Sequence, residues 1–367
     1  MLKRLFLFSV IAFTFIRCSN DLPINAEWQD IAYVYGVLDP RLDTQFVRIG
    51  KTFLGEAPPE QMAAISDSLY YDDIDVDIIE MNEDSVEQNR FRLERIDKPG
   101  KLNDNGPFST EDFHLYYTIE PIRDDHIYRL EISKPDGGPL VTATTDIPNW
   151  ASQEGNVFTS PRITINLANA NREPINDNLD YSRPNNSSVY NVMVYIHYSE
   201  QNINDPAQIT SKVLSYRTNL TNITTRSVAG SLSGSNFYAV VENNLDNNPN
   251  ILRYLDFVSL EAVVGGSDMR TYVEVNRPSP GIAQEKPMFT NVENGVGLFT
   301  SRNARFATSG GIVNPQIQEF RLHDRSINYL VMELCDKNFV KVGQDSCYCD
   351  GGNVVRLGNS TSNCGLL

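Results

Sequence analysis

Short apolar or alternating runs, each closed by turn residues, are the feature that most constrains what this chain can fold into. Such runs are typical of β-strands. In the first half they cover residues 31–38, 44–54, 73–78, 91–96, 113–119, 126–133 and 140–147. Gly137 and Gly138 mark the turn between the last two runs. Roughly seven short strands separated by turns predict a β-sandwich, which we expect to end near residue 149.

The second half of the chain is less regular. Strand patterns cover residues 157–167, 189–198, 209–217 and 255–264, with a shorter element at 317–322. Residues 168–186 are rich in Asn, Asp and Pro, which favours a loop. Asn294-Gly295 predicts a hairpin-type turn leading into residues 296–300. These patterns predict a second β-rich domain over residues 150–334.

A few short helices are also expected. Prolines precede a helical pattern at residues 58–65. Residues 237–245 place their apolar side chains on one helical face, which Ser235 or Asn236 would cap. A third helix is expected at 268–275, with Ser267 as its cap. The expected fold class is therefore mainly β, with a minor helical part.

The N-terminus reads as an export signal. Lys3 and Arg4 precede an uncharged run at residues 5–16, and Arg17 and Cys18 follow it. Twelve residues are too few to span a bilayer, which needs about 20, but they fit the apolar part of a signal peptide. We expect a signal peptide over 1–17, lipidation at Cys18 and a tether over 18–27. The alternative is a plain secretory signal or short membrane anchor, with Cys18 incidental.

Charge excludes one class of partner. The formal net charge is −16, and removing the proposed signal leaves 28 basic and 47 acidic residues, a charge of −19. Such a surface repels phosphate backbones, so nucleic-acid binding is not expected. It also opposes electrostatic docking on anionic lipid. The membrane contact would come from the lipid anchor in the outer membrane.

Four of the five cysteines lie in the expected C-terminal tail, residues 335–367. In an exported protein such a group indicates disulfides. A Cys347–Cys349 bond would be strained, which leaves two pairings: 335–347 with 349–364, or 335–349 with 347–364. Reduced thiols and a zinc site are the alternatives, although the spacing C-x11-C-x-C-x14-C lacks the usual paired C-x2-C units.

Strict alternation in Asp73-Ile74-Asp75-Val76-Asp77-Ile78 would place three carboxylates on one strand face. Such a row could bind Ca²⁺. A straight row does not converge on an ion, however, so we expect a solvent-facing edge strand whose charges prevent sheet-to-sheet pairing. No metal site is predicted here.

No catalytic motif is present, and we expect neither an enzyme nor a cofactor. The four histidines, His114, His126, His197 and His323, have no metal-ligand spacing, although His114 and His126 lie on neighbouring expected strands. The segment Gly230-Ser231-Leu232-Ser233-Gly234 has the flanking glycines of a nucleophile elbow. Its third residue is Leu232, where a serine is required.

Three stretches of the chain carry a family resemblance: "AYVYGVLDPRLDTQFVRIGKTFLGE", "IYRLEISKPDGGPLVTATTDIP" and "EKPMFTNVENGVGLFTSR". In these stretches the chain resembles a family of Bacteroidota-type outer-membrane lipoproteins with a domain of unknown function. The resemblance implies an Ig-like β-sandwich, here over residues 28–149, followed by a second β-rich domain. Asp67-Ser68-Leu69 and Asp84-Ser85-Val86 also resemble the O-glycosylation signal of such organisms, which makes Ser68 and Ser85 candidate sites.

The family implies location rather than chemistry. Such proteins are often associated with outer-membrane transport systems. We therefore expect a binding or accessory module at the outer membrane, on its periplasmic or its surface face, beside a transport or envelope protein. A structural or adhesive surface protein is the first alternative. A hydrolase whose site has no sequence motif is the second.

Overall fold

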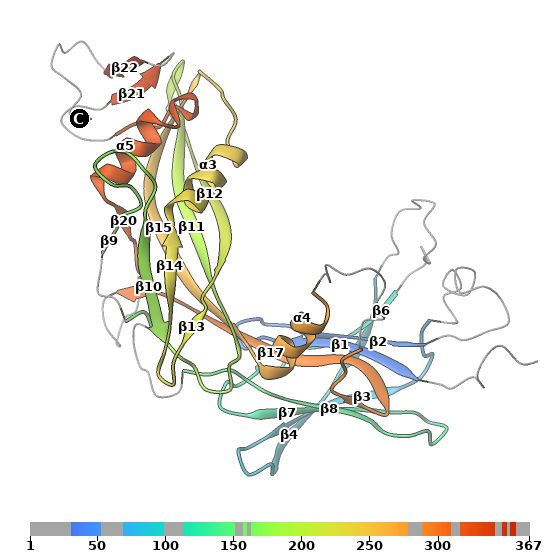
Figure 1. Cartoon of the computed structure of the whole chain (residues 1–367). Coiled ribbons are helices and arrows are strands. Elements are labelled where there is room, and N and C mark those ends of the chain that lie inside the picture. The colour runs from blue at the N-terminus through green and yellow to red at the C-terminus, as the bar shows by residue number, and fades with distance from the viewer. Residues whose placement is uncertain are drawn as a thin grey trace, which may run out of the picture.

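The structure is a computed structural model of the chain. It describes residues 31–52, 69–98, 113–150, 157–159, 163–277, 288–309, 316–341, 347–350 and 353–356. Within these ranges the fold is mainly β, as the sequence predicts, and it contains several sheets and three short α-helices. The two arms of the molecule, here called the first and second lobes, meet at an angle (Figure 1).

One eight-stranded sheet runs through both lobes. Its strands are, in spatial order, β12 (Asp205–Asn219), β11 (Val189–Asn202), β15 (Ile251–Gly265), β17 (Gly295–Phe306), β1 (Ala32–Leu38), β2 (Gln45–Lys51), β6 (Phe113–Thr118) and β5 (Glu94–Lys98). Strand β17 joins the lobes, because residues 295–301 pair in parallel with β1 whereas residues 302–306 pair antiparallel with β15.

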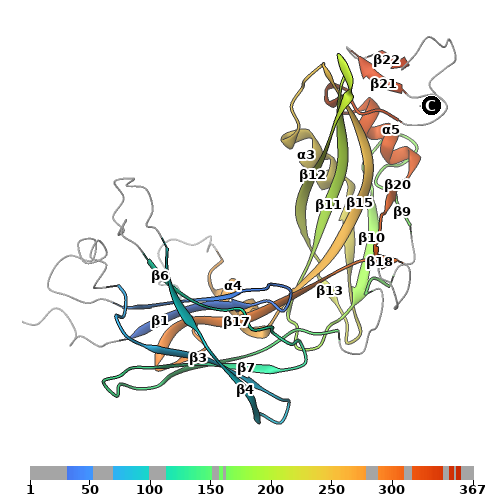
Figure 2. The same ribbon diagram turned by 180° about the vertical axis from the view of Figure 1, so that it is seen from behind.

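The first lobe is a two-layer sandwich. Its second layer is a five-stranded sheet in the order β16 (Val292–Glu293), β8 (Val141–Asp146), β7 (Ile127–Ser133), β3 (Asp75–Met81) and β4 (Glu87–Arg92). Figure 2 shows this layer beneath the β1–β2–β17 layer. Alternate apolar side chains of both sheets form one core, with Val34 and Ile49 from one layer against Ile78 and Leu130 from the other.

The second lobe packs its part of the large sheet against smaller elements. These are the sheet β10 (Asn176–Ser182), β14 (Ser227–Ser233) and β13 (Asn222–Ile223), the strand pair β9 (Thr164–Ile165) and β20 (Arg321–Leu322), and the helices α3 (Gly234–Asn244) and α5 (Asp324–Met332). Phe237 of α3 and Leu330 of α5 are buried in the same core as Val194 of β11. The remaining pairs are β18 (Thr308–Ser309) with β19 (Gln316–Ile317), and β21 (Cys347–Asp350) with β22 (Asn353–Arg356).

Helix α4 (Ser267–Val275) lies in the angle between the lobes, beside β17 (Figure 1). An ion-pair network links the lobes nearby. Arg41, in the turn after β1, pairs with Glu261 of β15 and with the fully buried Asp39. Arg302 of β17 donates to the Asp39 carboxylate at 2.8 Å. Burial alone would raise the pKa of Asp39, but bonds from Arg41 and Arg302 bring it below its ordinary value.

Most strand predictions in the first half are confirmed, with two corrections. The expected strand at 91–96 is two strands in different sheets, β4 and β5, which separate at the buried Leu93. The acidic strand β3 is not an edge strand. It pairs with β4 on one side and β7 on the other. Alternation of charged and apolar residues indicates that a strand has two unlike faces, but it does not indicate whether the strand pairs with other strands on one side or on both.

In the second half, the expected strand at 157–167 is wrong in its described part. Only Thr164–Ile165 is a strand there, with an isolated bridge at Phe158. The expected loop at 168–186 contains strand β10, whose Leu179 and Tyr181 are buried against the second core. These buried side chains and the pairing of β10 with β14 along its whole length make this segment a strand, although its Asn and Asp residues favour a loop.

The helices at 237–245 and 268–275 are confirmed, but their caps differ. Ser233 caps α3, and its side chain accepts a hydrogen bond from the Asn236 amide at 3.3 Å. Helix α4 has Gly266 at its N-cap, while Ser267 is its first helical residue. Helix α5 was not expected. The predicted helix at 58–65 lies outside the described residues.

Asn294 has a positive φ of 54°, as the Asn-Gly turn requires, yet the turn does not close a hairpin. It connects β16, which pairs with β8, to β17, which pairs with β1. The chain therefore crosses here from one layer of the sandwich to the other. An immunoglobulin type is not shown for this sandwich, and the domain limits at 28–149 and 150–334 stay predictions.

Candidate functional site

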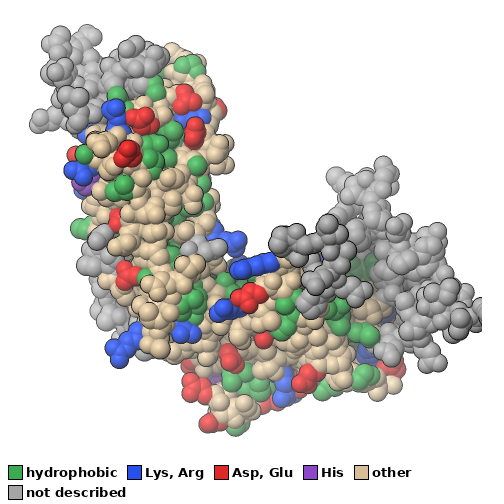
Figure 3. Space-filling model, viewed as in Figure 1, with side chains coloured by type: hydrophobic (Ala, Val, Ile, Leu, Met, Phe, Trp, Pro, Cys, Tyr) green, Lys and Arg blue, Asp and Glu red, His purple; other side chains and the backbone are tan. Residues whose placement is uncertain are grey.

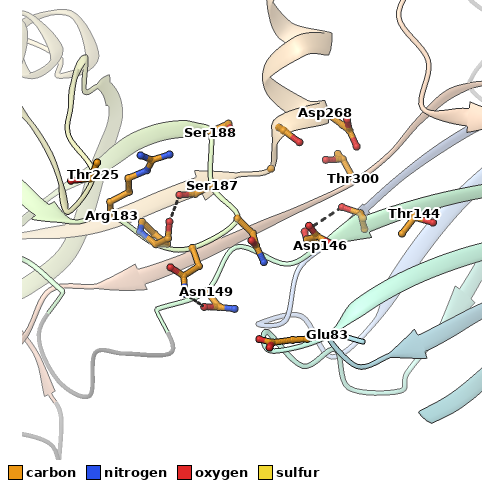
Figure 4. Close-up of a pocket in the computed structure, with 16 residues that line it drawn as sticks. Glu83, Thr144, Asp146, Asn149, Arg183, Ser187, Ser188, Thr225, Asp268 and Thr300 are labelled. Carbon is orange, nitrogen blue, oxygen red and sulfur yellow. Dashed lines mark hydrogen bonds between the residues drawn. The ribbon is translucent and has the colours of Figure 1, made fainter. Parts of the chain in front are cut away.

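A polar cleft of about 630 Å³ lies where the two lobes meet (Figure 4). Almost all of its lining side chains are polar, and most carry hydroxyl or amide groups. The lining residues are Glu83, Thr144, Thr145, Asp146, Asn149, Arg183, Pro184, Asn185, Asn186, Ser187, Ser188, Thr225, Gly266, Ser267, Asp268 and Thr300. The volume falls within the usual range for small-molecule sites, about 300–1,000 Å³.

Four separate parts of the fold position most of this lining, and Glu83, Asn149 and Thr225 come from other turns. Residues 144–146 end β8, residues 183–188 lead from β10 into β11, residues 266–268 begin α4, and Thr300 belongs to β17. Asn149, just after β8, ties two of these parts together, because its backbone N–H donates to the Asn185 carbonyl at 3.2 Å and its carbonyl accepts from the Asn185 N–H at 2.8 Å. The cleft thus depends on the angle between the lobes.

The first turn of α4 faces this cleft. Its N-cap, Gly266, has no side chain to bond the free amide groups of the first turn. A helix N-terminus carries partial positive charge, so donors are available at this end of the cleft.

The carboxylates of Asp146 and Asp268 place negative charge in the same cleft as the positive end of α4. The Asp146 side chain reaches solvent, but nearby protein atoms desolvate its carboxyl group, and this raises its pKa. The negative charge of Asp268 raises the pKa of Asp146 further. Asp268 itself accepts a hydrogen bond from Asn291 Nδ2 at 2.9 Å. The charge of Asp268 therefore acts on Asp146 across the cleft.

Several hydroxyl groups in the cleft are left without protein partners. The Thr300 hydroxyl is fully buried and makes no hydrogen bond. Within the described parts of the chain, the hydroxyl groups of Thr144, Ser188, Thr225 and Ser267 likewise make none. A buried hydroxyl without a partner costs free energy, about 1–3 kcal/mol. This cost applies to Thr300, whereas the hydroxyl groups of Thr144, Ser188, Thr225 and Ser267 reach solvent and are open to hydrogen bonds from a ligand.

The histidines do not form a site. His114 on β6 bonds Asp97 at 2.7 Å, whereas His126 bonds Asp125 at 2.7 Å just before β7. These strands belong to different sheets, so the expectation of neighbouring strands is wrong. His197 stacks on Phe257, and burial lowers its pKa. His323 caps α5, where its Nδ1 accepts from the Arg325 amide at 3.2 Å.

The acidic row on β3 is neutralised by arginine rather than arranged around a metal ion. Arg92 of β4 pairs with Asp75 and also with Asp77, at 2.6 Å for the second pair. Arg90 approaches Asp77 at 3.4 Å and Glu131 at 2.9 Å. The guanidinium groups thus occupy the positions that a calcium ion would need. No group of three or more metal-ligating side chains is found in the described residues.

The modification candidates are tested only in part. Ser85 is exposed on the turn between β3 and β4, where its φ is 61°. Cys18, Ser68 and Cys364 lie outside the described residues. Cys335 is one half of a disulfide, and its short helix η2 (Cys335–Lys337) lies next to β21, which carries Cys347 and Cys349. No disulfide has both cysteines described, so the pairing stays a prediction.

Sequence reasoning missed the polar cleft entirely. Asp146, Asp268 and Thr300 are far apart in the chain and share no motif. The only local signal is the run Arg183-Pro184-Asn185-Asn186-Ser187-Ser188, whose amide and hydroxyl groups are concentrated in six positions. Such a run is equally typical of an ordinary turn.

Comparison with known proteins gives no further assignment: no protein-family model matches this chain, and no curated protein does. In the described residues, no helix is long and apolar enough to cross a membrane.

Proposed function

We propose that this protein is an exported lipoprotein that acts as a binding or accessory module at the outer membrane, beside a transport or envelope protein. Its ligand in this proposal is neutral and rich in hydroxyl groups, as a short saccharide is. The polar cleft at the lobe junction is the binding site. The observation that carries the proposal is the set of unpartnered hydroxyl groups in this cleft.

The charge of the cleft favours a neutral ligand. Its ionisable lining residues are Glu83, Asp146, Asp268 and Arg183, so acids outnumber bases. An anionic ligand would be repelled by these carboxylates, whereas a sugar hydroxyl donates to them. The serine, threonine and asparagine side chains of the lining can both donate and accept, which matches a ligand whose hydroxyl groups do the same.

The proposed location rests on the sequence. The signal over residues 1–17 and the cysteine that follows it support export and lipidation at Cys18. The family resemblance supports the outer membrane as the destination. The acidic surface supports protein or ligand partners rather than nucleic acid.

A binding experiment tests the ligand class. The purified full chain is screened on immobilised saccharides, and the best ligand is titrated by calorimetry. Ser188→Ala with Ser267→Ala should weaken that ligand by about 1–3 kcal/mol, since each lost hydrogen bond contributes about 0.5–1.5 kcal/mol. Ser211→Ala, on the exposed part of β12, is the matched control and should change nothing.

Two results would contradict the ligand proposal: no saccharide binds, or the double variant binds as tightly as the control. The location is tested separately with radiolabelled palmitate, which should label the wild type but not Cys18→Ala. Pull-down from solubilised envelopes should then recover a transport or envelope protein. Recovery of matrix or host proteins instead would favour the adhesive alternative.

A further inference from the structure

A second cleft, of about 790 Å³, runs along the side of α4 and has a different chemistry from the polar cleft. The strands β11, β12 and β15 form one wall, and α4 forms the other. Val37 of β1 and Arg302 of β17 also line this cleft. It lies in the inner angle between the lobes, where basic side chains gather in the space-filling view (Figure 3).

This cleft is basic in an acidic protein. Arg217, Arg270, Arg277 and Arg302 line it, against the single acid Glu274, although the whole chain has a formal charge of −16. Arg270 pairs with Glu274, and Arg302 with Asp39. The guanidinium groups of Arg217 and Arg277 have no acidic partner among the described residues. Their charge is available to an anion from outside.

The same cleft exposes apolar surface. Val37 is 40% exposed, Ile223 40% and Val273 45%. On α4, Met269 and Val273 are four residues apart and so lie on one helical face. Apolar area left in water is unfavourable by roughly 25 cal/mol per Å². An apolar ligand group that covers these side chains would therefore bind favourably.

We propose that this basic cleft binds a free single-chain anionic amphiphile, such as a fatty acid. The acyl chain packs against the valine and methionine side chains, and its carboxylate pairs with Arg217 and Arg277. Arginine suits this role because its planar guanidinium group bonds a carboxylate through two parallel N–H donors. The two clefts share Ser188 but otherwise differ in lining and in charge, and the variants that test this proposal leave the lining of the saccharide site unchanged.

Calorimetry with sodium laurate, kept below its critical micelle concentration, tests the proposal on the purified full chain. Laurate should bind, whereas butyrate, which has the carboxylate without the chain, should show no measurable binding. Octaethylene glycol monododecyl ether, which has the chain without the charge and carries no sugar, should bind at least tenfold more weakly than laurate. Arg217→Gln with Arg277→Gln should weaken laurate at least tenfold, and so should Val273→Asp.

The control is Arg325→Gln, an exposed arginine on α5 outside the cleft, and it should bind laurate as the wild type does. Because Arg217, Val273 and Arg277 are all exposed, these variants should keep the wild-type unfolding temperature. The proposal is overturned if laurate fails to bind, or if the arginine variant binds like the control. Binding only to anionic vesicles, and not to free laurate, also overturns it.

Discussion

The pKa of the Asp146 carboxyl group depends on a residue from a distant part of the chain. Asp146 ends strand β8, far in sequence from Asp268, and its pKa is raised by burial and by the charge of that second acid. The folded protein therefore holds the Asp146 proton more tightly than the unfolded chain does. Binding of this proton stabilises the folded state, and the effect is complete at pH values below the ordinary pKa of 3.8. The stabilisation is lost as the pH rises through the raised pKa of the folded state.

We expect Asp146→Asn to unfold at a higher temperature than the wild type at pH 7, because asparagine avoids the ionised form that the folded state disfavours. At pH 3.5 the difference should shrink, since the wild-type carboxyl group is then largely protonated in both states. Thermal unfolding followed by circular dichroism measures both values. Asp205→Asn, at the exposed start of β12, controls for the loss of one negative charge. Equal differences at both pH values would contradict the interpretation.

At the scale of single elements, tertiary contacts set where a helix begins. The apolar periodicity of α3 correctly predicts a helix, yet the two caps expected from it, Ser235 and Asn236, both lie inside the helix. Strand β14 runs directly into α3, and its last residue, Ser233, has the extended backbone that an N-cap needs, with ψ at 121°. The helix therefore begins earlier than its apolar pattern does.

Ser233→Ala should lower the free energy of unfolding by about 1 kcal/mol, because the Asn236 amide loses its acceptor. Ser235→Ala is the matched control inside the first turn, and we expect a change within about 0.5 kcal/mol. Urea denaturation of both variants gives the comparison. If Ser235→Ala were the more damaging change, the cap would be wrongly assigned.

At the scale of the whole molecule, β17 makes the two lobes one structure. Its first part completes the sandwich of the first lobe, and its last part extends the sheet of the second. Gly297 is the critical point of this strand. Its φ is +125°, and an added Cβ would lie 2.0 Å from the Val34 carbonyl oxygen. The Arg41–Glu261 ion pair adds a second connection between the lobes.

We expect one calorimetric unfolding transition for both lobes, because neither can lose β17 without breaking its sheet. Gly297→Ala should shift that whole transition to lower temperature, since the strained φ alone costs about 1–3 kcal/mol. Gly138→Ala, in an exposed turn where the nearest contact is a flexible lysine side chain, should shift it little. Two resolved transitions, or a shift confined to part of the peak, would show that the lobes unfold separately.

Prediction from sequence succeeded where the signal is local. The strands around Val34, Leu130 and Val194 are buried on alternate positions, so their periodicity is visible in the chain itself. It failed where a neighbour decides the outcome. The sequence of residues 176–182 predicts a loop, but these residues form a strand because β14 pairs with them. The charge pattern of β3 predicts an edge strand, but β4 pairs with it on its outer side.

The sequence by itself determined that this protein is mainly β, where most strands lie, that Asn294 turns the chain and that the surface is acidic. Only the tertiary structure decided which strands pair, that β17 serves both lobes, and that Asp146, Asp268 and Thr300 meet in one cleft. The physical reason is that side-chain periodicity and turn preference are properties of neighbouring residues. Backbone hydrogen bonds, by contrast, are chemically alike in every strand, so the choice of partner depends on how all the side chains pack together.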